Sequence, residues 1–191
     1  MQEAVPVGQG SMIAVLGLKT EEIYDLIGQW KFRGVCEIAN DNAEGQVILS
    51  GDTENISSFQ KLLKNKKIKS IPLKVSAPFH CSLMKPAAEA MRDKINKVNF
   101  NKTSNQIICN VTAKPENNPD LIKKLLVNQI FSTVKWRESL IYMSQTGEKN
   151  FIEIGPGKAL TGMVKRTVND ANCFSINSIT DIKNLQNELK K

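Results

Sequence analysis

The stretch GVCEIANDNAEGQVILSGD, residues Gly34–Asp52, predicts a β-hairpin in the first third of the chain. Gly34–Asn40 and Gln46–Asp52 are short runs whose apolar residues favour strands. Between them, Asp41–Gly45 contains residues that favour turns. We therefore take two antiparallel strands joined by a turn as the centre of the first half of the fold.

A strand and a helix precede the hairpin. Ser11–Leu18 is an apolar run that Gly17 helps to end, and Thr20 is suited to cap the helix that follows. The apolar residues that share one face of this helix are Ile23, Leu26 and Ile27. The periodicity changes from that of a strand to that of a helix, so we expect a β–α pair here.

A second helix and a fourth strand follow the hairpin. Either Thr53 or Asn55 caps the helix, and Ile68–Val75 alternates apolar and polar residues as a strand does. The inward residues of the helix are Ile56, Phe59, Leu62 and Leu63. The order βαββαβ is that of the split βαβ or ferredoxin-like arrangement, in which two helices cover one face of a four-stranded sheet. We expect residues 1–77 to form a ferredoxin-like subdomain.

Residues 78–191 show longer helices and fewer strands. The expected helices are Pro86–Val98, Asp120–Phe131, Val134–Gln145, one that opens after Gly157, and a final one with Ile182, Leu185 and Leu189 inward. The expected strands are Gln106–Val111, Asn150–Gly155 and Phe174–Asn177. The inward residues of the other helices are expected to include Ala87, Ala90, Met91 and Ile95, then Leu121, Leu125, Leu126 and Ile130, and later Leu160, Met163 and Val164. Two or three strands are too few for a buried parallel sheet, so we interpret this half as part of a larger α/β subdomain.

Composition indicates a globular protein that does not span a membrane. The N-terminal residues MQEAVPVGQGS contain Glu3 and no basic stretch followed by an apolar one, so we expect no secretory signal or transit peptide there. Hydrophobic residues make up 41% of the chain and charged residues 24%, and no apolar run approaches the roughly 18 residues of a membrane span. The net charge of +7 comes from 22 Lys against 4 Arg, which favours a solvated basic surface over nucleic-acid readout. The four cysteines are widely spaced, so we expect neither a metal site nor a disulfide framework.

The single histidine, His80, is the one imidazole available for acid–base chemistry. It lies in VSAPFHCSLMKPA, after a predicted strand and before a helix that begins near Pro86. A loop between a strand and a helix is where sheet enzymes often present functional groups, although a lone histidine is more often structural. Neighbouring residues on an extended chain point to opposite sides, so Cys81 is interpreted as structural rather than as a partner of His80.

Several motifs together resemble the malonyl-CoA:acyl-carrier-protein transacylase family. They are APFHCSLMKPA, then LVNQIFSTVKW at Leu126–Trp136, then FIEIGPGKALTGMVKR at Phe151–Arg166, with further likeness in MQEAVPVGQGSMIAVLGL and NDNAEGQVILSG. Their order and spacing extend over essentially all 191 residues. The resemblance implies a ferredoxin-like subdomain inserted into an α/β-hydrolase-like subdomain, with the active site between them. This chain would be the C-terminal portion.

The resemblance implies a ping-pong acyl transfer, in which a serine attacks malonyl-CoA and the pantetheine thiol of acyl carrier protein then attacks the acyl-enzyme. His80 would be the base, and the backbone carbonyl of Gln129 would orient its imidazole. Phe79 would narrow the acyl pocket, while Asn40 and Asn42 would face the cleft. The structural alternatives are a packed aromatic for Phe79 and an Asx-rich turn for the two asparagines.

Partners follow from the same resemblance. Acyl carrier protein is acidic, and Lys66, Lys67 and Lys69 precede His80 at a distance that a pantetheine arm could span, although a solubilising cluster is an equal alternative. Malonyl-CoA would be a substrate, with no cofactor and no metal required. We further expect a monomer when complete, a cytoplasmic location, and no nucleic-acid or membrane partner.

The family's nucleophile motif, G-H-S-x-G, does not occur in these residues. The chain is therefore expected to be inactive alone. Two alternatives remain at this point: a non-catalytic module that binds a ligand or RNA, and one half of a split enzyme. The predicted strands carry no aromatic pair of the kind that stacks RNA bases, which counts against RNA.

Overall fold

The computed structural model describes residues 2–30 and 33–188. The chain forms two compact units, Met1–Ser139 and Leu140–Lys191, and the boundary predicted at residue 77 falls inside the first of them. Within the described residues, no helix is both long enough and apolar enough to cross a lipid bilayer.

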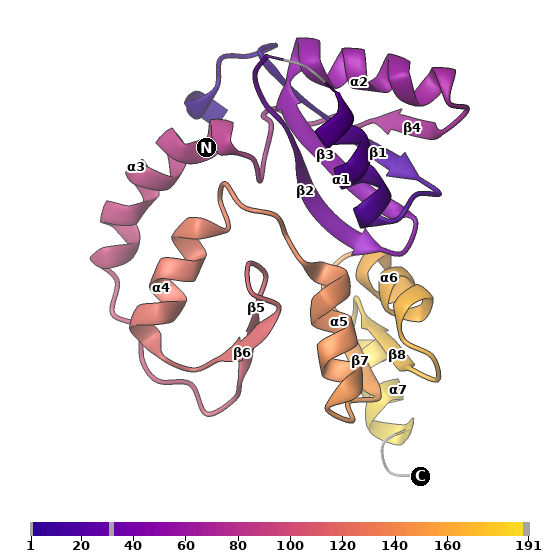
Figure 1. Cartoon of the computed structure of the whole chain (residues 1–191). Coiled ribbons are helices and arrows are strands. Elements are labelled where there is room, and N and C mark those ends of the chain that lie inside the picture. Colours follow the sequence, from indigo (N-terminus) through magenta and orange to yellow (C-terminus); the bar gives the residue numbers. More distant parts are fainter. Residues whose placement is uncertain (1, 31–32, 189–191) are drawn as a thin grey trace. The chain divides into compact units, whose positions relative to one another are not determined.

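The first unit contains a four-stranded antiparallel sheet (Figure 1). Its strands, in spatial order, are β2 (Cys36–Ala43), β3 (Gln46–Asp52), β1 (Gly10–Leu16) and β4 (Lys69–Pro72). Its helices are α1 (Thr20–Gln29) and α2 (Thr53–Asn65). The chain order is therefore βαββαβ, as the periodicity predicts.

Both helices contribute to one apolar cluster, so they cover the same face of the sheet. Ile23 of α1 and Phe59 of α2 are fully buried against Val15 and Leu49 of the central strands. Trp30, just after α1, meets Phe59 edge to face with ring centroids 6.4 Å apart. Such a buried aromatic supplies a large share of the hydrophobic stabilisation of a small sheet.

The hairpin differs from its prediction in the length of its turn. Strand β2 continues to Ala43, and only Glu44 and Gly45 form the turn, with Gly45 at φ +71°. The predicted turn residues Asp41 and Asn42 belong to the strand, because Asp41 pairs with Val47 and Ala43 with Gln46 of β3. The N–H of Asp41 also donates to the carbonyl of Val134, far along the chain. The fourth strand is also shorter than predicted, at Lys69–Pro72.

The rest of the first unit is mainly helical. Its further elements are η1 (Gln2–Ala4), η2 (Ser82–Met84), α3 (Lys85–Asn96), β5 (Ile107–Cys109), β6 (Lys114–Glu116), α4 (Pro119–Asn128) and the start of α5 (Trp136–Gln145). Strands β5 and β6 form a small antiparallel pair, of which the sequence predicted only the first. The predicted inward faces of α3 and α4 are partly wrong. On α3, Ala90 and Met91 (37%) are exposed, because this helix packs through Ala87 and Ala88. On α4, Leu121 is 40% exposed, because this helix packs through Ile122 and Val127.

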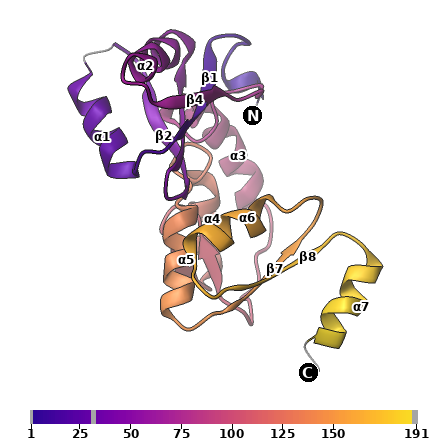
Figure 2. The same ribbon diagram turned by 90° about the vertical axis from the view of Figure 1, so that its right-hand side faces the viewer.

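The second unit is a two-stranded parallel sheet with helices. Figure 2 shows β7 (Asn150–Ile154) beside β8 (Asn172–Ile176), with α7 (Ile179–Glu188) following β8. Helix α6 (Ala159–Thr167) connects the strands and buries Thr161 and Val164. The predicted inward residues Leu160 and Ile182 are exposed instead, since two strands offer little surface to cover them; Leu189 lies outside the described residues.

Candidate active site

The loop that carries His80 is held in an unusual backbone conformation. His80 has φ +59°, in the left-handed region that non-glycine residues seldom adopt. The next residue, Cys81, is fully buried, and its thiol donates to the carbonyl of Pro78 at 3.1 Å. The two neighbours therefore do different things: Cys81 anchors the loop in the core, and the imidazole of His80 stays half-buried.

His80 and Gln129, predicted as a pair, are brought together. Nδ1 of His80 lies 2.7 Å from the backbone carbonyl oxygen of Gln129, the residue that ends α4. A carbonyl oxygen can only accept, so Nδ1 must carry the proton in this contact. In the neutral ring, Nε2 then keeps the lone pair that a general base requires.

The side chain of Gln129 has a separate partner. Its Oε1 accepts a hydrogen bond from Nδ2 of Asn110 at 3.2 Å. The backbone of Gln129 is fixed by α4, because its N–H donates to the carbonyl of Leu125 at 2.9 Å. The acceptor for His80 is thus set by main-chain geometry, and the amide side chain ties it to the β5–β6 region.

Glu37 is a site residue that the sequence reasoning missed. Its carboxylate accepts from the N–H of Ser82 at 2.8 Å and from the Ser82 hydroxyl at 2.6 Å. These bonds join β2 to the start of η2, two residues after His80, and so fix the loop from the other side. The only signal in the sequence is an acid within the apolar run VCEIA, which by itself names no partner.

A pocket of about 390 Å³ opens beside the imidazole. Its walls come from α1, β2, the His80 loop and the segment after α4: Tyr24, Ile27, Cys36, Glu37, Ile38, His80, Phe131, Ser132 and Thr133. The mixture of apolar walls with a few polar groups is typical of a small-molecule site.

The thiols near the pocket are poor nucleophiles. Burial, together with the charge of Glu37, raises the pKa of Cys36 to about 12. Burial also raises the pKa of Cys81 above its ordinary value. A thiol that stays protonated does not attack a thioester. Among the described residues, the pocket therefore has an oriented imidazole at its edge, and the two thiols near it have raised pKa values.

The other predicted site residues do not line the pocket beside His80. Phe79 is half-buried and packs against two apolar clusters, as a core aromatic does. Asn40 and Asn42 are half-buried on β2, flank the buried Asp41, and do not line the pocket. Lys67 and Lys69, but not Lys66, line a separate hollow of about 530 Å³ at the junction of α2 and β4, together with Lys61 and Lys64.

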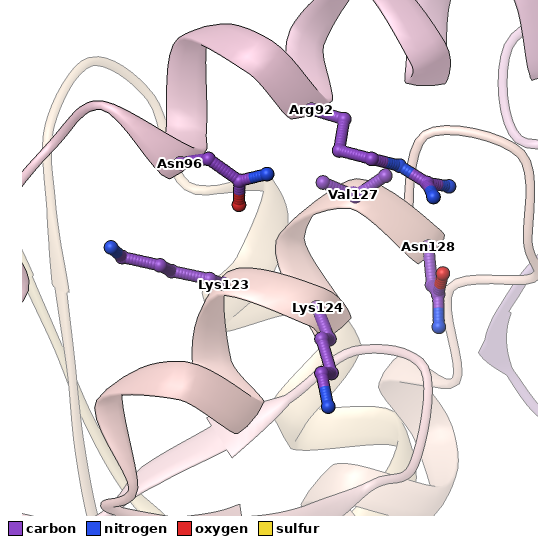
Figure 3. Close-up of a pocket in the computed structure, with 6 residues that line it drawn as sticks. All are labelled: Arg92, Asn96, Lys123, Lys124, Val127 and Asn128. Atoms are coloured by element: carbon purple, nitrogen blue, oxygen red, sulfur yellow. The ribbon is translucent and has the colours of Figure 1, made fainter.

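A second pocket, of about 360 Å³ between α3 and α4, is basic but does not form an anion cradle. In Figure 3 its cations, Arg92, Lys123 and Lys124, point in different directions. The ammonium of Lys123 lies 5.4 Å from the centre of the Phe100 ring, and Arg92 pairs with Glu89 at 3.0 Å. No group of three or more metal-ligating side chains occurs in the part of the chain that the structure describes.

Known proteins are similar to this chain over most of its length. A family model described as "Acyl transferase domain" matches residues 1–190. Malonyl CoA-acyl carrier protein transacylase of Escherichia coli K12 is 38% identical over 178 residues, which are 93% of this chain and 58% of that protein. The protein of the same name from Bacillus subtilis is 38% identical over 168 residues, 87% of this chain and 53% of that one.

Solved structures give the same result. The malonyl CoA-acyl carrier protein transacylase of Clostridium perfringens matches with a TM-score of 0.94 and 35% identity, covering 100% of this chain and 60% of that one. A malonyl-transacylase solved in complex with its type II PKS acyl-carrier protein matches with a TM-score of 0.91 and 33% identity, covering 97% and 61%. The chain thus spans between half and three-fifths of the length of these relatives.

Proposed function

Because this chain belongs to the acyl transferase family, we propose that it is the portion of a malonyl-CoA:acyl-carrier-protein transacylase that supplies the histidine base. The observation that carries the proposal is the 2.7 Å contact between Nδ1 of His80 and the Gln129 carbonyl. That contact leaves Nε2 free to accept a proton. The complete protein comprises this chain together with the segment that would carry the serine nucleophile.

The proposed reaction has two half-reactions with one base. Nε2 of His80 takes the serine proton as the serine oxygen attacks the malonyl thioester, and the imidazolium returns that proton to the departing CoA thiolate. In the second half-reaction His80 deprotonates the pantetheine thiol, which attacks the acyl-serine, and the proton goes back to the serine oxygen. The Gln129 carbonyl stabilises the ring while it is charged, as a triad carboxylate does elsewhere.

Substrate contacts are assigned to residues near this base. We propose that the pocket beside His80 receives the thiol-bearing arm of CoA or of the carrier protein, since its walls are largely apolar. Phe79 would limit the size of the acyl group, and Asn40 and Asn42 would face the cleft of the complete protein. No metal or cofactor is needed for this chemistry, because the thioester is already activated.

The subdomain division is proposed on the same basis. The βαββαβ order and the strand order β2-β3-β1-β4 support a ferredoxin-like subdomain at residues 1–77. Residues 78–191 would belong to the α/β-hydrolase-like subdomain. The complete protein would act as a cytoplasmic monomer in fatty acid biosynthesis, without a nucleic-acid or membrane partner.

Carrier-protein docking is proposed at Lys66, Lys67 and Lys69. All three side chains are exposed, and Lys67 and Lys69 share their hollow with two further lysines. An acidic partner would be steered to such a surface, and its affinity would fall as salt rises.

The test is malonyl transfer by the complete protein from malonyl-CoA to holo acyl carrier protein. We expect a malonyl-serine intermediate and its transfer to the carrier thiol. Changing Lys66, Lys67 and Lys69 together to Glu should raise the KM for carrier protein about tenfold or more at low salt, while the malonyl-CoA half-reaction stays nearly unchanged.

The matched control reverses three exposed lysines elsewhere, Lys102, Lys114 and Lys149, and so changes the net charge equally. It should leave the KM close to that of the unaltered protein. Equal effects of the two triple variants would refute the docking site. Absence of any malonyl transfer by the complete protein would refute the proposed function.

A further inference from the structure

An ion pair between a buried Asp41 and a partly buried Arg137 joins β2 to the first turn of α5. Both carboxylate oxygens of Asp41 accept from Nε of Arg137, at 2.9 and 3.0 Å, and Nη2 of Arg137 lies 2.8 Å from Oδ2. The Asp41 side chain is 3% exposed and that of Arg137 is 23% exposed. Hydrogen bonding to Asp41 is the largest cause of a raised pKa at Arg137. The proposed reaction makes no direct use of either residue.

Main-chain hydrogen bonds also join β2 to the segment just before α5. The N–H of Val134 donates to the carbonyl of Ala39 at 2.8 Å, and the N–H of Asp41 donates to the carbonyl of Val134 at 2.9 Å. The hydroxyl of Thr133 donates to the carbonyl of Ile38 at 2.6 Å. Residues 133–137 are therefore attached to β2 by main-chain bonds at one end and by the ion pair at the other.

This attached segment leads back to the acceptor of His80. Gln129 lies only four residues before Thr133, and its carbonyl receives Nδ1 of His80. Asn110 connects the two ends of the segment: its carbonyl accepts from the N–H of Lys135 at 2.9 Å, and its amide donates to Oε1 of Gln129 at 3.2 Å. Any shift of residues 133–137 would therefore be passed to the residue that orients the imidazole.

Stability alone does not account for such a pair. Removing two charges from water costs about as much as their attraction returns, and replacing a buried pair by apolar residues is often neutral or stabilising. What the pair supplies is a fixed geometry, because a guanidinium bound through Nε and Nη2 to one carboxylate has little freedom.

We propose that Arg137 and Asp41 are positioning residues that set the path of residues 129–137 and thereby hold the Gln129 carbonyl against Nδ1 of His80. The structural part of this inference is independent of the reaction; its catalytic consequence rests on the proposed function. Without the pair, the ring would sample both tautomers, and a smaller fraction would present a free Nε2.

The test compares variants in the complete protein by ¹⁵N NMR of the His80 ring, with its signals assigned from a His80→Gln sample. Arg137→Met should change the ring from one predominant tautomer to a mixture, and should lower kcat of the malonyl-CoA half-reaction about tenfold to a hundredfold with little change in KM. Arg137→Lys keeps the charge but loses the forked contact with Asp41. Its tautomer population and its kcat should therefore lie between those of Arg137→Met and those of the unaltered protein.

Two further variants separate positioning from folding. Asp41→Asn with Arg137→Met removes both charges, so it should fold with near-normal stability and still show the mixed tautomer. Arg92→Met removes an arginine from an exposed pair with Glu89, at 49% and 65% exposure, and should leave the His80 signals unchanged. The tautomer is measured without turnover, so a protein inactive in malonyl transfer would still test the positioning.

The proposal is overturned if folded Arg137→Met keeps the single tautomer and kcat, or if Arg92→Met shifts the ring signals as much. It is also overturned if the double variant fails to fold, because the pair would then be a stability element. Recovery of the single tautomer in the double variant would likewise contradict it.

Discussion

Replacing His80 by Ala in the complete protein should lower the rate of malonyl transfer by about 10³-fold or more, with both half-reactions affected. The imidazole is the only histidine ring that this chain contributes, and its Nε2 is the group freed for proton transfer. The rate of malonyl-serine formation, followed by mass spectrometry in a single turnover, measures the loss. A variant that retained most of its rate would remove His80 from the mechanism.

The neighbouring thiol provides the control. Cys81→Ala should change the transfer rate little per folded molecule, because burial keeps the Cys81 pKa raised and its thiol donates to Pro78 inside the core. Strong inactivation of this variant would mean that the thiol takes part in the reaction.

Phe59→Ala should lower the free energy of unfolding by about 3–5 kcal/mol. The ring is fully buried between α2 and the sheet, where it meets Trp30 edge to face, so its removal leaves a cavity and exposes the indole. Urea unfolding followed by tryptophan fluorescence measures the change. Val7→Ala, at a residue that is 94% exposed, should change the free energy by less than about 0.5 kcal/mol. A loss at Phe59 no larger than that at Val7 would contradict this description of the core.

The first half of the fold could be predicted because its pattern is local. Strand β3 was predicted with its observed bounds, Gln46–Asp52. Helix α2 begins at Thr53, but its N-cap is Asp52, so the prediction that Thr53 or Asn55 caps it was wrong. The turn was predicted too long, because Asp41 and Asn42 are residues that favour turns but lie in β2, where Asp41 pairs with Val47 of β3. The contacts of Asp41 with Val134 and Arg137 come from residues far along the chain and have no local signal.

Burial on α3 and α4 was harder to predict than their positions. Both helices form close to the expected residues, but Met91 and Leu121, expected inward, are exposed. Periodicity identifies an apolar face, and it does not show which part of that face has a neighbour. The residues that do pack, such as Ala88 and Val127, are no more apolar than those that do not.

The site was predictable in part. The loop position of His80 follows from the strand and the helix predicted on either side of it. Gln129 was predicted only through a family resemblance, because every residue type has a main-chain carbonyl and the sequence cannot show which one accepts from His80. Glu37 is 45 residues from its partner Ser82, and Asp41 is 96 residues from Arg137. No local pattern links positions so far apart.

The central claim is that the Gln129 carbonyl holds His80 with Nδ1 protonated and Nε2 free. The most direct measurement is the pair of ring ¹⁵N chemical shifts of His80 in the complete protein, at a pH where the imidazole is neutral. We expect the Nδ1 signal to be that of a protonated nitrogen and the Nε2 signal that of an unprotonated one. A ring that carries its proton on Nε2 would contradict the account, because it could not accept the serine proton at the nitrogen that faces away from Gln129.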